Sequence, residues 1–135
     1  MDIAPLSQLP WAVGHDRFIA AADAVKDVGA YCLFVIDEAI PAGARAGYAA
    51  LVIAYARANE PVTILEGGAA ALLIRDGGVA SGVTAARRLL AQMSKLGLKE
   101  TLRAGVCALS VDTAAALEEA RQLAVGARAG EVATA

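Results

Sequence analysis

Residues 62–74, which read VTILEGGAAALLI, decide how this chain folds. Two short apolar runs flank Gly67-Gly68, and apolar runs of this length bounded by glycine are typical of buried strands. Glycine tolerates a positive φ at both positions of a tight turn. The stretch therefore predicts a β-hairpin, with strands at about 62–66 and 70–74.

Working outward from this hairpin, the run YCLFVI at 31–36 predicts a central strand buried on both faces, and residues 102–109 predict a fourth strand. Apolar residues that recur at helical spacing predict four helices. These helices span about 15–27, 44–59, 81–96 and 113–128. The order β-α-β-β-α-β between the outer helices is the split ferredoxin-like arrangement. We therefore predict an α/β (α+β) fold: a ferredoxin-like βαββαβ palm with a mostly antiparallel sheet, an N-terminal helix and a C-terminal helix, followed by a frayed tail at 129–135.

Length and charge limit the functions that the chain can have. With 135 residues it has the size of one domain, and a formal net charge of −2 offers no basic surface for nucleic acid or for an anionic membrane. No apolar run reaches the roughly 18 residues of a membrane span, and the N-terminus lacks the pattern of a signal peptide. We expect a cytoplasmic protein that binds neither nucleic acid nor membrane.

The two cysteines do not suggest a redox or metal site. Cys32 and Cys107 each lie inside an apolar run, as buried small hydrophobic residues do. The chain has one histidine and no close cluster of cysteine and histidine, so a structural zinc site is not expected.

Five short motifs follow one another in a family-like order. They are PLSQLP at 5–10, VID at 35–37, GGAAA at 67–71, LRAGV at 102–106 and ARQLAVGAR at 120–128. In order and spacing they resemble the GGDEF family of diguanylate cyclases, which condense two GTP molecules into cyclic di-GMP on a ferredoxin-like palm. The resemblance implies one degenerate GGDEF-like domain over residues 1–135, and it allows that the domain was excised from a longer multidomain regulator.

The departures from the family pattern bear on catalysis. Phosphoryl transfer in such a site needs divalent cations held by carboxylates. The resemblance implies that Asp37 would be one metal ligand, but Ala69 and Ala70 stand where the hairpin should supply the other. The stretch 38–43 also leads almost directly into a helix, so the family's guanine-reading Asn and Asp have no counterpart. We predict vestigial catalytic positions only, with no metal and no cofactor. These positions are Asp37, Gly67, Gly68, Ala69 and Ala70.

Three charged residues are candidate ligand contacts. Arg57 and Glu60 resemble the family's product-inhibition motif, R-x-x-D, although the motif lies one residue too far from Gly67. The two side chains can pair with each other at i, i+3, or Arg57 can grip a phosphate or stack on guanine. Arg128 matches a lysine of the family's last helix, and it is either a phosphate contact or a solvated charge at a helix end.

The sequence therefore predicts a catalytically inactive GGDEF-like signalling domain, not an enzyme, that acts as a protein-interaction or regulatory module in cyclic di-GMP-related signalling. Its expected partner is another signalling protein, a neighbouring domain or a second copy of the chain. The alternative is a non-catalytic nucleotide sensor that binds cyclic di-GMP or GTP. Two further alternatives are an active enzyme that uses Asp37, and a looser similarity of residues 66–68 and the strand after them to bacterial microcompartment shell proteins.

Overall fold

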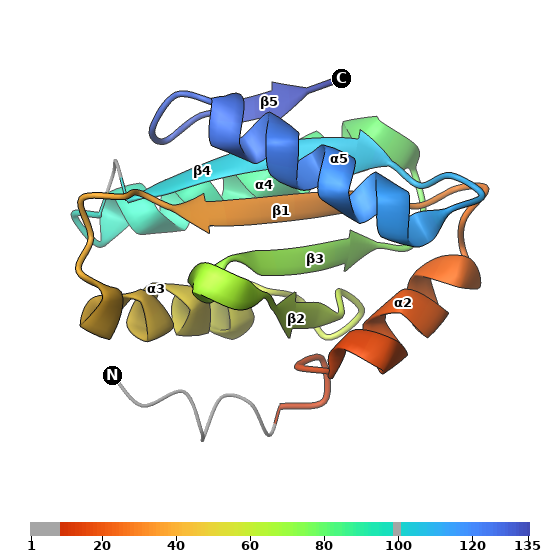
Figure 1. Cartoon of the computed structure of the whole chain (residues 1–135), viewed down its shortest axis with the longest axis horizontal. Helices are drawn as coiled ribbons and strands as arrows, with labels where there is room; N and C mark the ends of the chain where they lie inside the picture. The colour runs from red at the N-terminus through yellow and green to blue at the C-terminus, as the bar shows by residue number, and fades with distance from the viewer. Residues whose placement is uncertain (1–8, 99–100) are drawn as a thin grey trace.

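The computed structural model describes residues 9–98 and 101–135 of the chain, so most of the motif at 5–10 lies outside the described residues. The strands are β1 (Ala30–Ile36), β2 (Val62–Ile64), β3 (Ala70–Ile74), β4 (Leu102–Ala108) and β5 (Val132–Thr134). The helices are α2 (His15–Asp23), α3 (Ala42–Tyr55), α4 (Gly78–Lys95) and α5 (Thr113–Gly126), with a short 3-10 turn, η1 (Glu66–Gly68). Figure 1 shows these elements arranged around one sheet.

The sheet has the order β2-β3-β1-β4-β5. The central strand β1 is antiparallel to both β3 and β4, and β2 is antiparallel to β3. Without β5, this is the strand order of the split βαββαβ arrangement. The predicted fold is therefore confirmed, and the apolar run of β1 is buried on both faces as expected.

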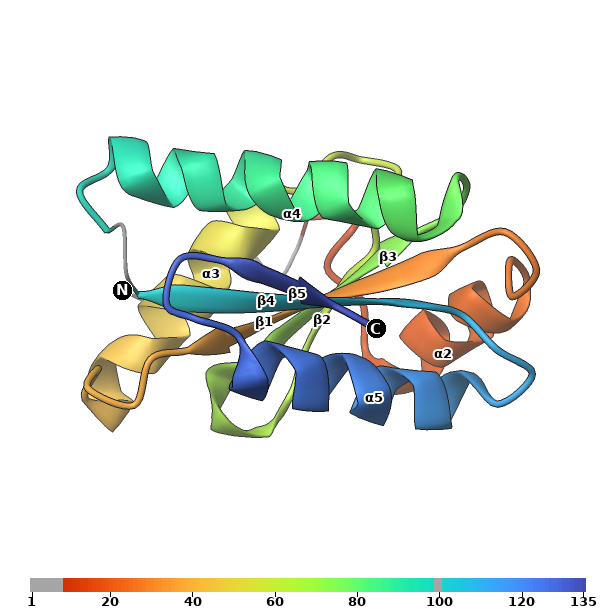
Figure 2. The same ribbon diagram turned by 90° about the horizontal axis from the view of Figure 1, so that it is seen from above.

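Helices cover both faces of the sheet, as the view along its edge shows (Figure 2). Residues of α3 and α4 pack into the apolar core on one face, and residues of α2 and α5 pack into the core on the other. Gly105 of β4 lets α5 approach closely, because a Cβ there would lie 2.3 Å from the carbonyl oxygen of Ala120. On the opposite face, a Cβ on Gly82 of α4 would lie 2.6 Å from Val106 Cγ1.

The helix ends differ from the prediction. The first helix stops at Asp23 instead of about residue 27, and the second stops at Tyr55 instead of about residue 59. After Tyr55 the chain becomes extended and then makes a turn closed by the Glu60 N–H on the Arg57 carbonyl, 2.9 Å away. The third helix begins at Gly78 rather than at Ser81, because glycines with positive φ at 77 and 78 turn the chain earlier.

The prediction of a frayed tail at 129–135 is wrong. Residues 132–134 form β5, which pairs in parallel with β4. Two backbone hydrogen bonds attach the start of this strand: Gly130 N–H to Leu102 O at 2.7 Å, and Ala104 N–H to Glu131 O at 3.0 Å. These small residues thus form a strand because an existing edge accepts them.

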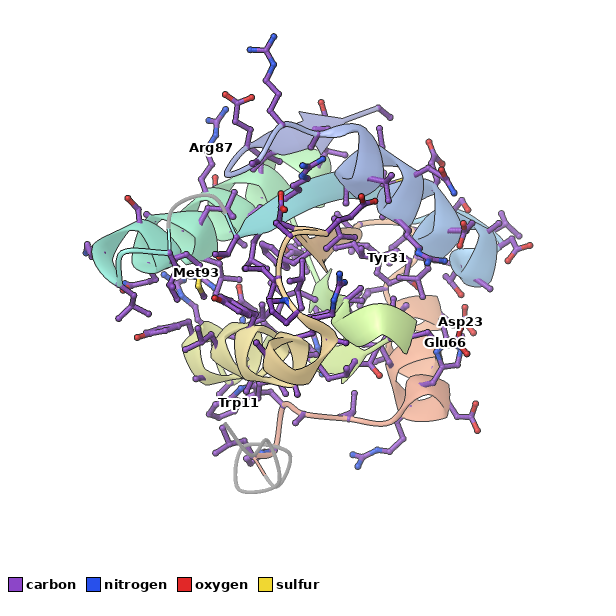
Figure 3. The ribbon with its side chains drawn as sticks, turned by 60° about the vertical axis from the view of Figure 1, so that its left-hand side comes forward. Trp11, Asp23, Tyr31, Glu66, Arg87 and Met93 are labelled. Atoms are coloured by element: carbon purple, nitrogen blue, oxygen red, sulfur yellow. The ribbon has the colours of Figure 1, made fainter. Side chains whose placement is uncertain are left out.

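The other edge of the sheet is covered by the segment that precedes α2. The Val62 N–H donates to Trp11 O at 2.7 Å, and the Val13 N–H donates to Val62 O at 2.9 Å. Trp11 lies beside α3 (Figure 3), and its indole N–H donates to Ile53 O of that helix at 2.7 Å. Trp11 therefore packs this segment onto the domain.

Cys32 and Cys107 are free, buried and on neighbouring strands. Their positions differ by one residue in the register of β1 and β4, so they enter the cores on opposite faces of the sheet. Burial raises the pKa of the Cys32 thiol to about 12 and that of Cys107 to about 11. Among the described residues no helix combines the length and apolar character needed to cross a bilayer.

Candidate functional site

The predicted vestigial site assembles at the end of β1. Because β1 lies beside β3, Asp37 comes next to the turn between β2 and β3. A shallow pocket of about 200 Å³ there is lined by residues that include Asp37, Gly67 and Ala69. Gly68 lies beside it, against Ile36 and Arg45. Asp37, Gly67, Gly68 and Ala69 therefore lie close together in the structure.

The turn itself is one residue longer than predicted. Leu65 N–H donates to Ala69 O at 2.7 Å, so three residues, Glu66 to Gly68, connect the strands instead of two. Gly67 and Gly68 have φ angles of 76° and 83°, as expected for a turn that requires glycine. Neither angle suits a residue with a side chain.

The two alanines at the family's carboxylate positions are buried. Ala69 is 6% exposed and lines the pocket, whereas Ala70 is fully buried in the core on the α3 and α4 face of the sheet. An ionised carboxylate at position 70 would have to leave water without a partner, which is costly. Ala70 is therefore not part of the pocket, contrary to its grouping with the site positions.

Asp37 is engaged by an arginine. Its Oδ2 lies 3.1 Å from Arg103 Nη2, and its Oδ1 accepts the Ala39 N–H at 2.9 Å. These hydrogen bonds hold the pKa of the Asp37 carboxyl below its usual range, the Ala39 amide first and Arg103 second, with a smaller contribution from the charge of Arg45. The carboxylate therefore has a guanidinium on Oδ2.

Three arginines line this pocket, and the sequence analysis identified none of them. They are Arg45 of α3, Arg103 of β4 and Arg121 of α5. Arg103 was detectable in principle, since a single charge inside the apolar run of β4 needs a partner. Its Nη1 also donates to Ala127 O at 3.4 Å, and its buried Nε has no hydrogen-bond partner among the described residues.

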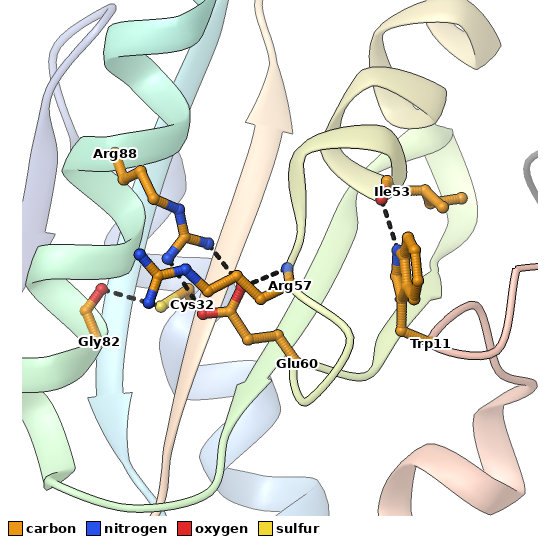
Figure 4. Close-up of polar contacts among 7 residues, drawn as sticks. All are labelled: Trp11, Cys32, Ile53, Arg57, Glu60, Gly82 and Arg88. Carbon is orange, nitrogen blue, oxygen red and sulfur yellow. Dashed lines mark hydrogen bonds and ion pairs between the residues drawn. The ribbon is translucent and has the colours of Figure 1, made fainter.

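Glu60 forms a second ionic site, and none of its residues lines this pocket. Its carboxylate accepts the Arg57 backbone N–H at 2.7 Å and both terminal nitrogens of Arg88, at 2.5 and 3.3 Å (Figure 4). The Glu60 carboxylate thus pairs with the Arg57 backbone and with the Arg88 guanidinium of α4. Arg57 itself is exposed, and Arg88 is the residue that the sequence analysis missed.

Arg128 does not join either group. The last helix ends at Gly126, so Arg128 lies in the turn that leads to β5, where its carbonyl accepts the Glu131 N–H at 3.0 Å. It is exposed, and the residue of α5 that reaches the pocket is Arg121. No group of three or more metal-ligating side chains occurs within residues 9–98 and 101–135.

Comparisons with known proteins rest on structure alone. No protein-family model matches the chain, and no curated protein matches it. A microbial GGDEF domain studied for a novel interaction mode with cyclic di-GMP superposes with a TM-score of 0.63 over 97% of this chain and 94% of its own, at 12% identity. The chain has a GGDEF-like fold. A fragment comprising only the GGDEF domain of TpbB (YfiN) from Pseudomonas aeruginosa gives a TM-score of 0.62 over 96% of this chain and 92% of its own, at 20% identity.

Proposed function

We propose that this chain is a non-catalytic GGDEF-like module that acts by contacting another protein in cyclic di-GMP-related signalling. The observation that carries the proposal is the Asp37–Arg103 contact. A divalent cation in such a site needs several oxygen ligands. Asp37 already has a cation, the guanidinium, on Oδ2 at 3.1 Å.

The other lining residues support the same proposal. Glu38 and Glu66 line the pocket and are exposed, but Arg45 and Arg121 line it too, so the charges balance. Ala69 offers only a methyl group. This donor set does not fit two catalytic ions, and we derive no reaction step through a metal here.

The experiment is a turnover assay with a matched variant. The purified chain is incubated with GTP and magnesium, and nucleotides are separated by ion-exchange chromatography. We expect no loss of GTP and no cyclic di-GMP from the wild type or from Asp37→Asn. Turnover by the wild type that disappears in Asp37→Asn would refute the proposal and favour an enzyme that uses Asp37.

A second candidate function, a nucleotide sensor, is favoured by one specific contact. Arg88 joins the Arg57–Glu60 turn, so two arginines from different elements meet at one surface (Figure 4). Arginine suits phosphate because its planar fork binds two oxygens at once. One protein with a similar structure is a GGDEF domain that interacts with cyclic di-GMP. The sensor would bind cyclic di-GMP or GTP without turning it over.

Arg57 is the residue to change in the test. Its backbone amide, not its side chain, makes the contact to Glu60, so Arg57→Ala should leave the turn intact. Ligand at about 100 times its dissociation constant should stabilise the native wild type by roughly 2.7 kcal/mol, which thermal melting detects. We expect Arg57→Ala to abolish this shift and Arg75→Ala, at another exposed arginine, to retain it. An equal shift in Arg57→Ala would exclude this surface as the nucleotide-binding site.

A further inference from the structure

The two edges of the sheet differ in what pairs with them. At the β2 edge, the segment around Trp11 and Val13 takes up backbone hydrogen bonds of Val62. At the other edge, β5 has a single neighbour among the described residues, β4. Figure 2 looks onto this edge and shows β5 between α4 and α5 with no ribbon across its outer side.

The outer side of β5 presents backbone groups in a definite pattern. Ala104 donates to Glu131 O, so residue 131 directs its carbonyl toward β4. Backbone polar groups alternate sides along a strand, so Ala133 also faces β4 and the register pairs it with Gly105. Val132 and Thr134 therefore present their N–H and C=O groups outward.

The side chains of β5 are not of the kind that usually prevents strand addition. Exposed edges are commonly protected by charged residues, proline or a bulge. The three residues of β5, Val132 to Thr134, include neither a charge nor a proline. The edge is short, so pairing through it gives a weak contact rather than an obligate one.

From these observations the geometry points to β5 as a self-association edge, where a second copy of this chain adds its own β5 in antiparallel orientation. A two-fold axis through Ala133 places Val132 opposite Thr134 of the second copy. Both residues face outward, so each of the two pairs can exchange two hydrogen bonds. The small Ala133 side chains meet at the axis, where directly opposed residues come closest.

A groove beside the edge has room for the added strand's side chains. It measures about 570 Å³ and is lined by α4 residues such as Leu90 and Ala91 and by Val132 of β5. Arg87, which extends from α4 in Figure 3, and Glu131 line the same groove with opposite charges. In the proposed pairing, Thr134 of the second copy lies opposite Val132, so its side chain would enter this space on the α4 face.

Charges at the two ends of β5 favour the antiparallel orientation. Arg128 lies in the turn just before β5 and is exposed. Glu119 of α5 is exposed and lies near Cys107, which is one residue beyond the last β4 partner of β5. Opposite charges therefore flank opposite ends of the strand, and the two-fold axis brings Glu119 of one copy toward Arg128 of the other.

Sedimentation velocity of the full chain over a wide concentration range tests the inference. We expect the mass to rise from the 13.7 kDa monomer toward twice that value as concentration increases. Thr134→Pro removes one outward N–H without touching the β4 ladder, and it should weaken association at least about tenfold, a loss of one or two hydrogen bonds. Thr134→Ala keeps that N–H and should associate like the wild type.

A charge swap provides the second arm. Glu119→Arg and Arg128→Glu should each weaken the dimer, and the double variant should restore it. Circular dichroism and urea unfolding check that each variant is folded. A monomer at every concentration, or a dimer unaffected by Thr134→Pro and by the single swaps, would overturn the inference.

This inference rests on the proposed function, because it names a partner and a surface for the interaction module. The two can fail separately. Turnover of GTP would refute the non-catalytic proposal and leave the sedimentation result untouched, whereas a persistent monomer would leave open contact with a different protein.

Discussion

Two carboxylate–arginine pairs of this chain, Glu60–Arg88 and Asp37–Arg103, differ in burial. The Glu60 side chain is 8% exposed and its partner Arg88 is 25% exposed, whereas Asp37 and Arg103 are 21% and 33% exposed. Glu60 receives two guanidinium nitrogens and a backbone amide, but Asp37 receives a single guanidinium nitrogen and a backbone amide. A carboxylate–guanidinium pair therefore stabilises the fold at Glu60, whereas the pair at Asp37 occupies the candidate site.

The physical reason for this difference is desolvation. A buried carboxylate that loses its partner keeps an uncompensated charge away from water, whereas an exposed one regains solvent. Glu60 attaches the turn after α3 to α4. We infer that the Glu60–Arg88 pair is mainly structural, and that the Asp37–Arg103 pair can be removed at little cost to the fold.

The largest effect is expected for Arg88→Leu. Removing one partner of a buried pair typically costs about 3–5 kcal/mol, and Arg88 should fall near 3 kcal/mol because part of its side chain stays in water. Urea unfolding at neutral pH measures the loss. Arg87→Leu, at the exposed neighbouring position, is the control and should change the free energy of unfolding by less than about 0.5 kcal/mol. Equal effects of both variants would remove the contrast between the two pairs.

Cys32 offers an independent measure of the same pair. Its Sγ donates to Gly82 O at 3.0 Å, and burial is the main cause of its raised pKa, about 12, with the charge of Glu60 second. The native thiol should therefore resist a thiol reagent at pH 8. In a Cys107→Ala background, Arg88→Leu should raise the labelling rate of Cys32 about 100-fold, if labelling requires an opening whose free energy falls by about 3 kcal/mol. An unchanged rate would mean that the pair does not limit opening at Cys32.

These two pairs also show where sequence reasoning succeeds and where it stops. The hairpin and the central strand follow from apolar patterns, and the grouping of Asp37 with Gly67 followed from the resemblance to the GGDEF family. Partner choice does not follow, because Arg103 lies 66 residues from Asp37 and reaches it only through the β1–β4 register, which places Arg103 opposite Val35. A diagonal neighbour of this kind depends on register, which apolar patterns leave undetermined for strands buried on both faces.

Arg88 and β5 were missed for related reasons. The sequence predicted no partner for Arg88, because the turn at Arg57–Glu60 that brings a carboxylate to it replaced the predicted last turn of α3. β5 is only three residues long, and its strand conformation comes from pairing with β4 rather than from local propensity. Tertiary contacts decided both features.

A smaller effect is expected for Arg103→Leu. Ion pairs with this degree of exposure contribute about 0.2–1 kcal/mol, so the free energy of unfolding should fall by no more than about 1 kcal/mol. Urea unfolding beside Arg75→Leu, an exposed arginine after β3, separates the pair from a general loss of charge. A loss as large as that of Arg88→Leu would show that Arg103 is structural, and its buried Nε would then need a different explanation.

The smallest effect is the pH dependence contributed by Asp37. Its pKa is lowered in the folded state, so the folded protein holds this proton less tightly than the unfolded chain, whose carboxyl has the ordinary value of 3.8. The resulting stability is present above that value and is lost as the pH falls through the folded-state pKa.

Asp37→Asn removes the titrating group, so the free energy of unfolding of this variant should fall less steeply than that of the wild type below about pH 4. Urea unfolding at pH 6 and pH 3 measures the two slopes, and Asp76→Asn, at an exposed turn aspartate, serves as the matched control. Identical slopes in wild type and Asp37→Asn would mean that Arg103 and the Ala39 amide do not favour the ionised carboxylate, and the observation that carries the non-catalytic proposal would lose its electrostatic basis.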